Sequence, residues 1–195
     1  MGVDIALVRQ ARKGCHLSFE AIFRTYEAPI GRFLLGMVRD QALAEDLCQE
    51  TFASAYSGLS ALLDESQLAS WLYRIATNKA ISALRRRRMV AWVPFDVQLH
   101  DRAGRSDLSD DVAVDDAAAR SLARLPHDQV VCLLAHAEGL SYVELAHVLS
   151  CTLAAVKQRL YRARLAFRAA YAEETADQGG GRIGAAACAV STAEP

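Results

Sequence analysis

The sequence predicts an all-α protein in which a flexible acidic linker joins two small helical domains. Apolar residues recur mostly at helical spacings, and few stretches alternate as strands do. The chain has 195 residues, a length that suits one domain or two small ones. Its formal net charge of −1 conceals blocks of opposite sign along the chain. Together these observations favour two helical modules separated by a charged connection.

The charge blocks define the modules. Residues 1–91 carry a net charge of +3 and residues 120–172 carry +4, whereas residues 92–119 carry −5 and residues 173–195 carry −3. Basic modules of this kind are typical of proteins that bind the phosphates of nucleic acids. The near-neutral total therefore does not exclude a nucleic-acid partner.

Composition excludes several classes of protein. Hydrophobic residues make up 52% and charged residues 23%, the balance of a globular chain. No run of about 18 apolar residues exists, and Asp4 interrupts an N-terminus that lacks a secretory pattern. The five cysteines are odd in number and none forms a C-x-x-C pair. We therefore expect a cytoplasmic protein with free thiols, no metal site and no cofactor.

Helix signals set the expected boundaries. We expect an N-terminal segment at 1–17, a first helical domain at 18–91, a linker at 92–116, a second helical domain at 117–172 and a disordered tail at 173–195. The linker is Asp-rich and weakly periodic, and the tail contains a glycine run.

The first domain should contain three helices. Ser18 is the expected cap of the first, which Pro29 should kink or deprive of one hydrogen bond. Asp40 should cap the second. After a loop over 58–65, the third should run from about Ser66 to about Arg88. The apolar stripes of the three helices are Phe19, Ile22, Phe23, Tyr26, Ile30, Phe33, Leu34 and Met37; Leu43, Leu47, Phe52, Ala55 and Leu59; and Leu68, Leu72, Ile75, Ala76, Ala80 and Leu84.

The strongest local pattern lies at 139–168 and predicts a helix-turn-helix. Ser141 with Glu144 three residues later forms a capping box. A short helix should end near Leu149, and Thr152 should cap the next, whose core side is Val156, Leu160, Ala163 and Phe167. The outer side of that helix is basic, which suits the major groove of DNA. An ordinary helical hairpin with a solvated basic face is the alternative.

The third helix of the first domain, WLYRIATNKAISALRRRR at 71–88, carries a polar stripe. At about 100° per residue, its polar side chains fall within one sector, namely Arg74, Asn78, Ser82 and Arg85. Aromatic surface at Trp71 and Tyr73 beside cations and amides suits splayed single-stranded bases. A packed Trp71 and a solvated arginine end are the alternatives.

The preceding helix offers an acidic face. Asp46, Gln49 and Glu50 lie opposite Leu47 and Phe52. Carboxylates repel DNA, so this face suits a basic protein partner or is plain solvated surface.

Together the motifs resemble a bacterial RNA polymerase sigma factor of the extracytoplasmic-function (ECF) group within the sigma-70 family. The segment AEDLCQETF at 44–52 resembles region 2.2, and SWLYRIATNKAISALRRRR at 70–88 resembles regions 2.3–2.4. Residues 125–168 resemble region 4. The resemblance implies a region 2 bundle of three or four helices and a region 4 helix-turn-helix, and it implies no catalytic activity.

The resemblance also implies partners and roles. Core RNA polymerase would meet Asp46, Gln49 and Glu50 through its β′ clamp coiled coil, and its β flap would meet region 4. The −10 element would be bound by Arg74, Asn78, Lys79, Arg85, Arg86, Arg87 and Arg88, with the loop at Leu62 and Leu63 closing a base pocket. The −35 element would be bound by Thr152, Ala154, Ala155, Lys157, Gln158, Arg159 and Arg162. An anti-sigma factor, often membrane-bound in this group, would hold the free protein inactive.

Other functions stay open from the sequence. A sigma mimic that sequesters an anti-sigma factor would need the packing faces without the DNA side chains, and Asn78 and the arginines argue against it. A one-component regulator would need a ligand domain, for which no motif appears. An enzyme would need a nucleophile–base set or a phosphate loop, which the sequence lacks.

Overall fold

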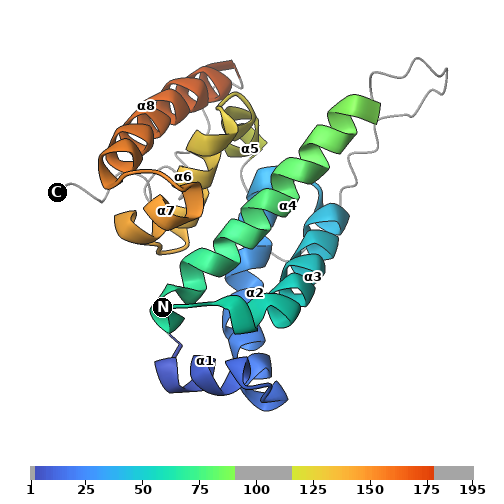
Figure 1. The fold of residues 1–195 in the computed structure, drawn as a ribbon. Coiled ribbons are helices and arrows are strands. Elements are labelled where there is room, and N and C mark those ends of the chain that lie inside the picture. The colour runs from blue at the N-terminus through green and yellow to red at the C-terminus, as the bar shows by residue number, and fades with distance from the viewer. Residues whose placement is uncertain (1–2, 91–115, 178–195) are drawn as a thin grey trace.

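The computed structural model describes residues 3–90 and 116–177, and every regular element within these ranges is a helix (Figure 1). The all-α prediction is confirmed. The N-terminal domain consists of α1 (Ile5–Arg12), α2 (His16–Val38), α3 (Gln41–Gly58) and α4 (Leu68–Val90), with short 3₁₀ turns η1 (Leu59–Ala61) and η2 (Glu65–Gln67). The C-terminal domain consists of α5 (Asp116–Ala123), α6 (His127–Ala137), α7 (Tyr142–Leu149) and α8 (Leu153–Asp177). The expected linker lies outside the described residues except for Asp116.

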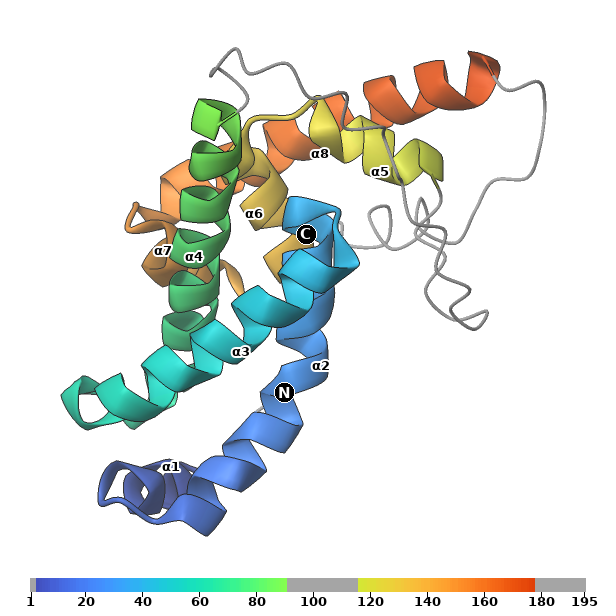
Figure 2. The same ribbon diagram turned by 90° about the vertical axis from the view of Figure 1, so that its right-hand side faces the viewer.

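The helices α2, α3 and α4 pack into a bundle whose core follows the predicted stripes (Figure 2). Ile30, Leu47 and Leu72 are fully buried between them. Phe33 of α2 meets Tyr73 of α4 edge to face, with ring centroids 5.1 Å apart. Burial of such apolar area supplies most of the stability of a small domain.

The expectation for the start of the first helix is wrong. α2 begins at His16, so Ser18 lies inside the helix, where its buried hydroxyl donates to Gln10 Oε1 at 3.0 Å instead of capping. The expected N-terminal segment at 1–17 contains α1, whose first turn is capped by Asp4. α1 packs on α2 through buried Val8, which fixes this helix to the bundle. α2 continues through the buried Pro29.

The second and third helices begin as predicted. The Asp40 carboxylate accepts a hydrogen bond from the Leu43 amide at 2.9 Å, the geometry of an N-cap. The loop after α3 is shorter than expected, because η1 and η2 order most of it. Asp64 caps η2 through the Ser66 amide at 2.9 Å.

The helix-turn-helix prediction is confirmed in geometry. The Ser141–Glu144 capping box opens α7, and Ser150 turns the chain in the left-handed region with φ 49°. Thr152 then accepts from the Ala155 amide at 3.2 Å at the start of α8. The predicted core side of α8 is buried at every position, namely Val156, Leu160, Ala163 and Phe167.

The second domain extends further than expected at its C-terminal end. α8 continues through Asp177, so the first residues of the expected tail are helical. Ion pairs hold this extension against the C-terminal end of α5. Arg120 Nε lies 2.6 Å from Glu174 Oε2, and Arg124 Nη2 lies 2.6 Å from Glu173 Oε2. The rest of that tail, 178–195, lies outside the described residues.

The Asp40 cap yields a stability prediction. Replacing Asp40 with Ala removes the cap and should lower the free energy of unfolding by about 1 kcal/mol. Asp40→Asn keeps the cap and loses only the ion pair with Arg87, so it should cost a few tenths of a kcal/mol. Urea unfolding of both variants measures the difference.

The same carboxylate predicts a pH dependence. The hydrogen bond from Arg87, followed by that from the Leu43 amide, holds the pKa of Asp40 below its ordinary value. Its stabilisation is therefore complete above about pH 4, the range of an unfolded aspartate, and is lost as pH falls through the depressed pKa. The gap between wild type and Asp40→Ala should shrink in acid, and a gap independent of pH would contradict this assignment.

Candidate functional site

The predicted polar face of α4 points to solvent. Arg74, Asn78, Ser82 and Arg85 are exposed, while Leu72, Ala76 and Ala80 on the opposite face are buried in the bundle. The small apolar residues let α4 sit close against its neighbours, so the face it turns outward is fixed. The exposed face combines guanidinium donors with an amide, groups that bind phosphates and base edges.

Two cations of the predicted DNA set are paired with carboxylates, one in the neighbouring α3 and one at its N-cap. Lys79 Nζ lies 3.2 Å from Glu50 Oε2, and Arg87 Nη2 lies 2.7 Å from Asp40 Oδ2. Ion pairs at the surface contribute only about 0–1 kcal/mol to folding stability. A DNA phosphate can therefore displace the carboxylate. Arg86 is exposed on the same end of α4, and the side chain of Arg88 lies outside the description.

A pocket of about 280 Å³ opens at the N-terminal end of α4. Trp71 and Arg74 supply flat aromatic and guanidinium surfaces, and Leu63 projects from the preceding loop with 92% exposure. Its lining is completed by Ala61, Leu62, Asp64, Gln67, Ser70 and His147. A flat aromatic and a guanidinium side by side are the groups on which unstacked bases stack.

The pocket differs from the expected one in three ways. Leu62 lines it but is only 6% exposed, so Leu63 alone projects at the mouth. Asn78 does not line it and lies one helical turn further along α4. Tyr73, expected to add aromatic surface, is buried against Phe33 in the core. Trp71, in contrast, is half-buried and reaches the pocket.

The polar groups of the pocket are fixed by local hydrogen bonds. Asp64 accepts from the Ser66 hydroxyl at 2.6 Å and from Gln67 Nε2 at 2.9 Å. The bonds from Ser66 and then Gln67 lower the pKa of Asp64 and so favour its anionic form. Ser70 donates to the carbonyl of Gln67 at 2.9 Å. The pocket thus presents an ordered polar edge beside its aromatic wall.

These polar residues were missed by sequence reasoning for two reasons. Asp64 and Gln67 stand in a short loop, where their spacing is equally typical of a capping turn. His147 belongs to α7 of the C-terminal domain, and no local pattern links it to residues of α4.

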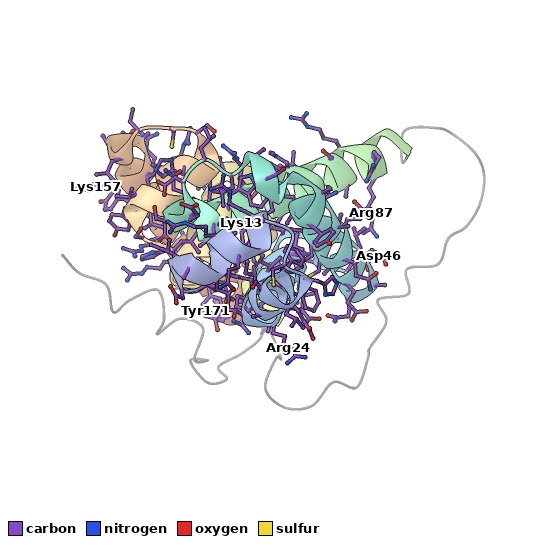
Figure 3. All side chains as sticks on the ribbon, turned by 60° about the horizontal axis from the view of Figure 1, so that its bottom comes forward. Lys13, Arg24, Asp46, Arg87, Lys157 and Tyr171 are labelled. Carbon is purple, nitrogen blue, oxygen red and sulfur yellow. The ribbon has the colours of Figure 1, made fainter. Side chains whose placement is uncertain are left out.

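The acidic face of α3 is exposed as expected. Asp46, Gln49 and Glu50 point away from the bundle, opposite buried Leu47 and Phe52 (Figure 3 labels Asp46). One helix therefore carries the acidic face, and its neighbour α4 carries the basic face. The Glu50–Lys79 pair joins the two faces directly.

The early part of α8 presents the predicted set in the C-terminal domain. Thr152, Ala154, Lys157, Gln158 and Arg162 are exposed (Figure 3 labels Lys157). Their shared exposure over the first turns of the second helix is the arrangement that major-groove recognition requires.

Two other members of that set are less accessible. Ala155 and Arg159 are half-buried. Arg159 Nε lies 3.2 Å from Asp128 Oδ2 of α6, so a DNA contact by Arg159 would replace an existing partner.

Sequence-family comparison divides the chain as the fold does. Residues 22–89 match the family described as Sigma-70 region 2, and residues 115–167 match the family described as Sigma-70, region 4. The chain is 30% identical to the ECF RNA polymerase sigma factor SigM of Bacillus subtilis, over 80% of this chain and 96% of that protein. It is 31% identical to the RNA polymerase sigma-H factor of Pseudomonas aeruginosa, over 83% of this chain and 90% of that protein.

Two solved structures are similar in fold. One is CnrH in complex with the cytosolic domain of CnrY, with TM-score 0.64 and 21% identity over 91% of this chain and 99% of that chain. The other is the sigma factor RpoE in complex with the anti-sigma factor NepR from Bartonella quintana. Its TM-score is 0.61, with 26% identity over 78% of this chain and 95% of that chain.

The Glu50–Lys79 pair predicts a gain in DNA affinity on neutralisation. Glu50→Gln should free Lys79 and raise affinity for labelled single-stranded DNA by up to about fivefold at low salt, with a smaller gain at high salt. Glu45→Gln removes the same charge from an exposed position of α3 that bonds Gln41 instead of a cation. Fluorescence anisotropy compares the two, and equal gains would contradict a specific role for the pair.

Proposed function

The chain belongs to the sigma-70 family, in its ECF group, and from this premise we propose how it directs RNA polymerase to promoters. The family implies core RNA polymerase and promoter DNA as partners. The protein performs no covalent step in this proposal. It binds polymerase with the acidic face of α3 and with the C-terminal domain, binds two DNA elements with two further surfaces, and uses binding energy to stabilise the melted strand. The observation that carries the proposal is the exposed cationic face of α4 running from an aromatic pocket, with a separate helix-turn-helix in the same chain.

We assign the −10 element to the pocket and the exposed face of α4. A base flipped from the non-template strand would stack on Trp71 and Arg74, with Asp64 and Gln67 reading its edge. Stacking is worth about 1–3 kcal/mol per base, enough to offset much of the cost of unstacking. Asn78 and Lys79 would contact the strand next to the pocket, and Arg85 to Arg88 would meet the phosphates beyond it.

We assign the −35 element to the first turns of α8. Gln158 is exposed where a recognition helix meets base edges, and a glutamine amide pairs with the N6/N7 edge of adenine. Lys157, Arg162 and Thr152 would bind phosphates, and Ala154 and Ala155 leave room for close approach. Arg159 would also bind DNA, after its ion pair with Asp128 is broken.

We assign polymerase binding to the acidic face of α3 and to the C-terminal domain. Asp46, Gln49 and Glu50 would dock on the β′ clamp coiled coil, and the C-terminal domain would meet the β flap. The acidic linker, 92–116, would thread toward the polymerase active site and the RNA exit channel, where a negative chain mimics RNA.

We also propose control by an anti-sigma factor in the cytoplasm. RpoE of Bartonella quintana is in complex with the anti-sigma factor NepR in its solved structure, which supports such a partner for this chain. The proposal includes a membrane anchor on this partner, as is common for anti-sigma factors of the ECF group. Within residues 3–90 and 116–177, no helix combines the length and apolarity needed to cross a membrane.

Transcription with purified components tests the function. The chain, added to core polymerase from its own source, should start transcripts from a defined subset of fragmented genomic DNA. Those start sites give the promoter. Failure on all genomic templates, at low salt and without an inhibitor, would overturn the proposal.

The base pocket gives a prediction about melting. Trp71→Ala should lower open-complex formation on that promoter by about tenfold or more, because stacking is lost. Trp71→Phe should retain most of it. Permanganate reactivity of unpaired thymines measures melting, and binding to a −35 duplex should not change. Equal melting by the Ala variant and wild type would remove the pocket from the mechanism.

The recognition helix gives a prediction about specificity. Gln158→Ala should weaken the free energy of binding to the preferred −35 sequence by about 1–3 kcal/mol. It should also relax sequence selection at one base pair. Arg162→Ala should weaken binding to all sequences. The slope of log affinity against log salt concentration should become shallower by about one, the value for one lost phosphate contact. Arg168→Ala, exposed later on α8, is the matched control. If Gln158→Ala and Arg162→Ala behave alike, the assigned roles are wrong.

A further inference from the structure

The base pocket has walls from three parts of the chain. Trp71 and Arg74 come from α4, the loop between α3 and α4 supplies Leu63 and Asp64, and α7 supplies His147. α4 is held in place by its buried face, and α7 packs directly on α4. The loop contains only short 3₁₀ turns. Its position beside the aromatic wall therefore needs a separate physical explanation.

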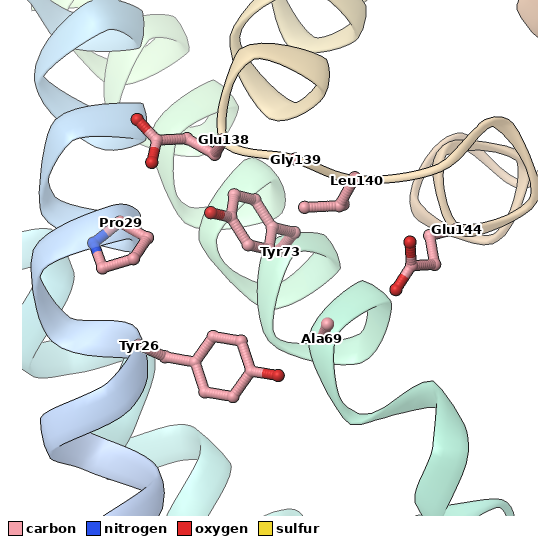
Figure 4. A pocket seen from close by; sticks show the side chains of 8 residues that line it. All are labelled: Tyr26, Pro29, Ala69, Tyr73, Glu138, Gly139, Leu140 and Glu144. Carbon is pink, nitrogen blue, oxygen red and sulfur yellow. The ribbon is translucent and has the colours of Figure 1, made fainter. Parts of the chain in front are cut away.

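α7 belongs to the junction between the two domains, where Arg32 Nη2 of α2 also lies 2.6 Å from Glu138 Oε2. A second cavity, of about 60 Å³, lies at this junction, with Tyr26 and Tyr73 on one side and Leu140 on the other (Figure 4). It has room for a few water molecules and not for a base. The larger pocket beside the loop is therefore the one in which the position of a wall matters for base capture.

Two anchors hold the loop, one on each side of Leu63 and Asp64. On one side Leu62 is only 6% exposed and packs into the apolar core. On the other side Glu65 pairs with α1, where Arg12 Nη1 lies 2.6 Å from Glu65 Oε1. The first anchor lies within the bundle, whereas the second depends on the helix that precedes it.

The Arg12–Glu65 pair is half-buried. The side chains are 27% and 19% exposed, and Arg12 Nε is buried without a hydrogen-bond partner among the described residues. The bond to Glu65 therefore offsets the cost of covering the Arg12 guanidinium. Charge-assisted hydrogen bonds of this kind are short and directional. Arg9 adds a more exposed cation, with Nε 3.6 Å from Glu65 Oε1.

α1 is itself fixed to the bundle, so it can hold the loop in place. Val8 and Ala11 are buried where α1 packs on α2. Gln10 Oε1 accepts a hydrogen bond from the Ser18 hydroxyl of α2 at 3.0 Å. The segment that matches Sigma-70 region 2 begins at residue 22, so α1 lies outside it. The contact between α1 and the loop thus joins the matched domain to a helix that precedes it.

We propose that Arg12 and Glu65 are positioning residues for base capture, and that α1 braces one wall of the pocket. Neither side chain lines the pocket. Their pair holds the end of η2 next to Asp64 and Leu63, while the other end of η2 runs directly into α4. The inference rests on the proposed function, because it concerns the pocket assigned to the −10 base.

Neutralising each partner separates positioning from simple electrostatics. Arg12→Gln removes a positive charge and Glu65→Gln removes a negative one, so their long-range effects on DNA binding are opposite in sign. The brace predicts the same result for both variants. Permanganate reactivity of unpaired thymines on the promoter should fall by about fivefold, while binding to a −35 duplex should stay close to wild type.

Arg24→Gln and Glu45→Gln are the matched controls. Arg24 pairs with Glu20 within α2, and Glu45 bonds Gln41 within α3, so each substitution changes the same charge without touching the loop. Both should melt the promoter as wild type does. Lower melting by Arg24→Gln together with higher melting by Glu65→Gln would show that charge alone governs melting, and would overturn the positioning role.

The position of the loop can be measured without DNA. Trp71 and Trp92 are the two tryptophans of the chain, so fluorescence in a Trp92→Phe background reports Trp71. Acrylamide, a neutral quencher, should quench Trp71 more strongly after Arg12→Gln or Glu65→Gln, because the loop no longer covers the pocket. The reversal Arg12→Glu with Glu65→Arg should lower quenching again and recover melting. Circular dichroism checks that all variants are helical.

The outcomes keep this inference apart from the proposed function. Quenching of Trp71 that is unchanged in both single variants would overturn the positioning of the loop by α1. Stronger quenching with melting equal to wild type would overturn its role in base capture. Absence of transcription with core polymerase for the wild-type chain would overturn the proposed function, and the quenching result would still decide whether α1 positions the loop.

Discussion

The packing of α4 into the N-terminal bundle is the constraint on which the rest of the structure depends. Leu72, Ala76 and Ala80 bury one face of the helix completely. Because side chains on a helix are fixed in angle relative to one another, this burial sets where Arg74 and Asn78 point. It also places Trp71 at the edge of the bundle, half-covered and able to line a pocket. A rotation of α4 would expose apolar surface and remove the polar face together.

Two surfaces with opposite charge share this small bundle. The acidic face lies on α3 and the basic face on α4, and Glu50 and Lys79 form an ion pair between them. A partner that engages Glu50 would release Lys79 without any backbone movement. In the proposed function, polymerase binding at Glu50 and DNA binding at Lys79 would therefore be linked by local electrostatics. The linkage is weak for one exposed pair, which suits reversible exchange of partners.

The relation between the domains adds a second level of organisation. The buried apolar residues of the two domains form one continuous cluster that extends across the junction. The junction combines one well-formed ion pair, Arg32–Glu138, with a cavity and an unsatisfied Tyr73 hydroxyl. The junction therefore combines a geometrically specific ion pair with imperfect packing.

The sequence by itself determined the local structure of this protein. Asp40, the Ser141–Glu144 box and the stripe from Val156 to Phe167 act within a few residues of chain, so periodicity and capping rules predict them. The tertiary structure decided the rest. Ser18 lost its capping role when α2 began earlier and α1 offered Gln10, and Tyr73 became a core residue through Phe33. His147 reached the pocket and Glu138 reached Arg32 only through domain docking, because contacts between distant segments depend on packing that no local pattern records.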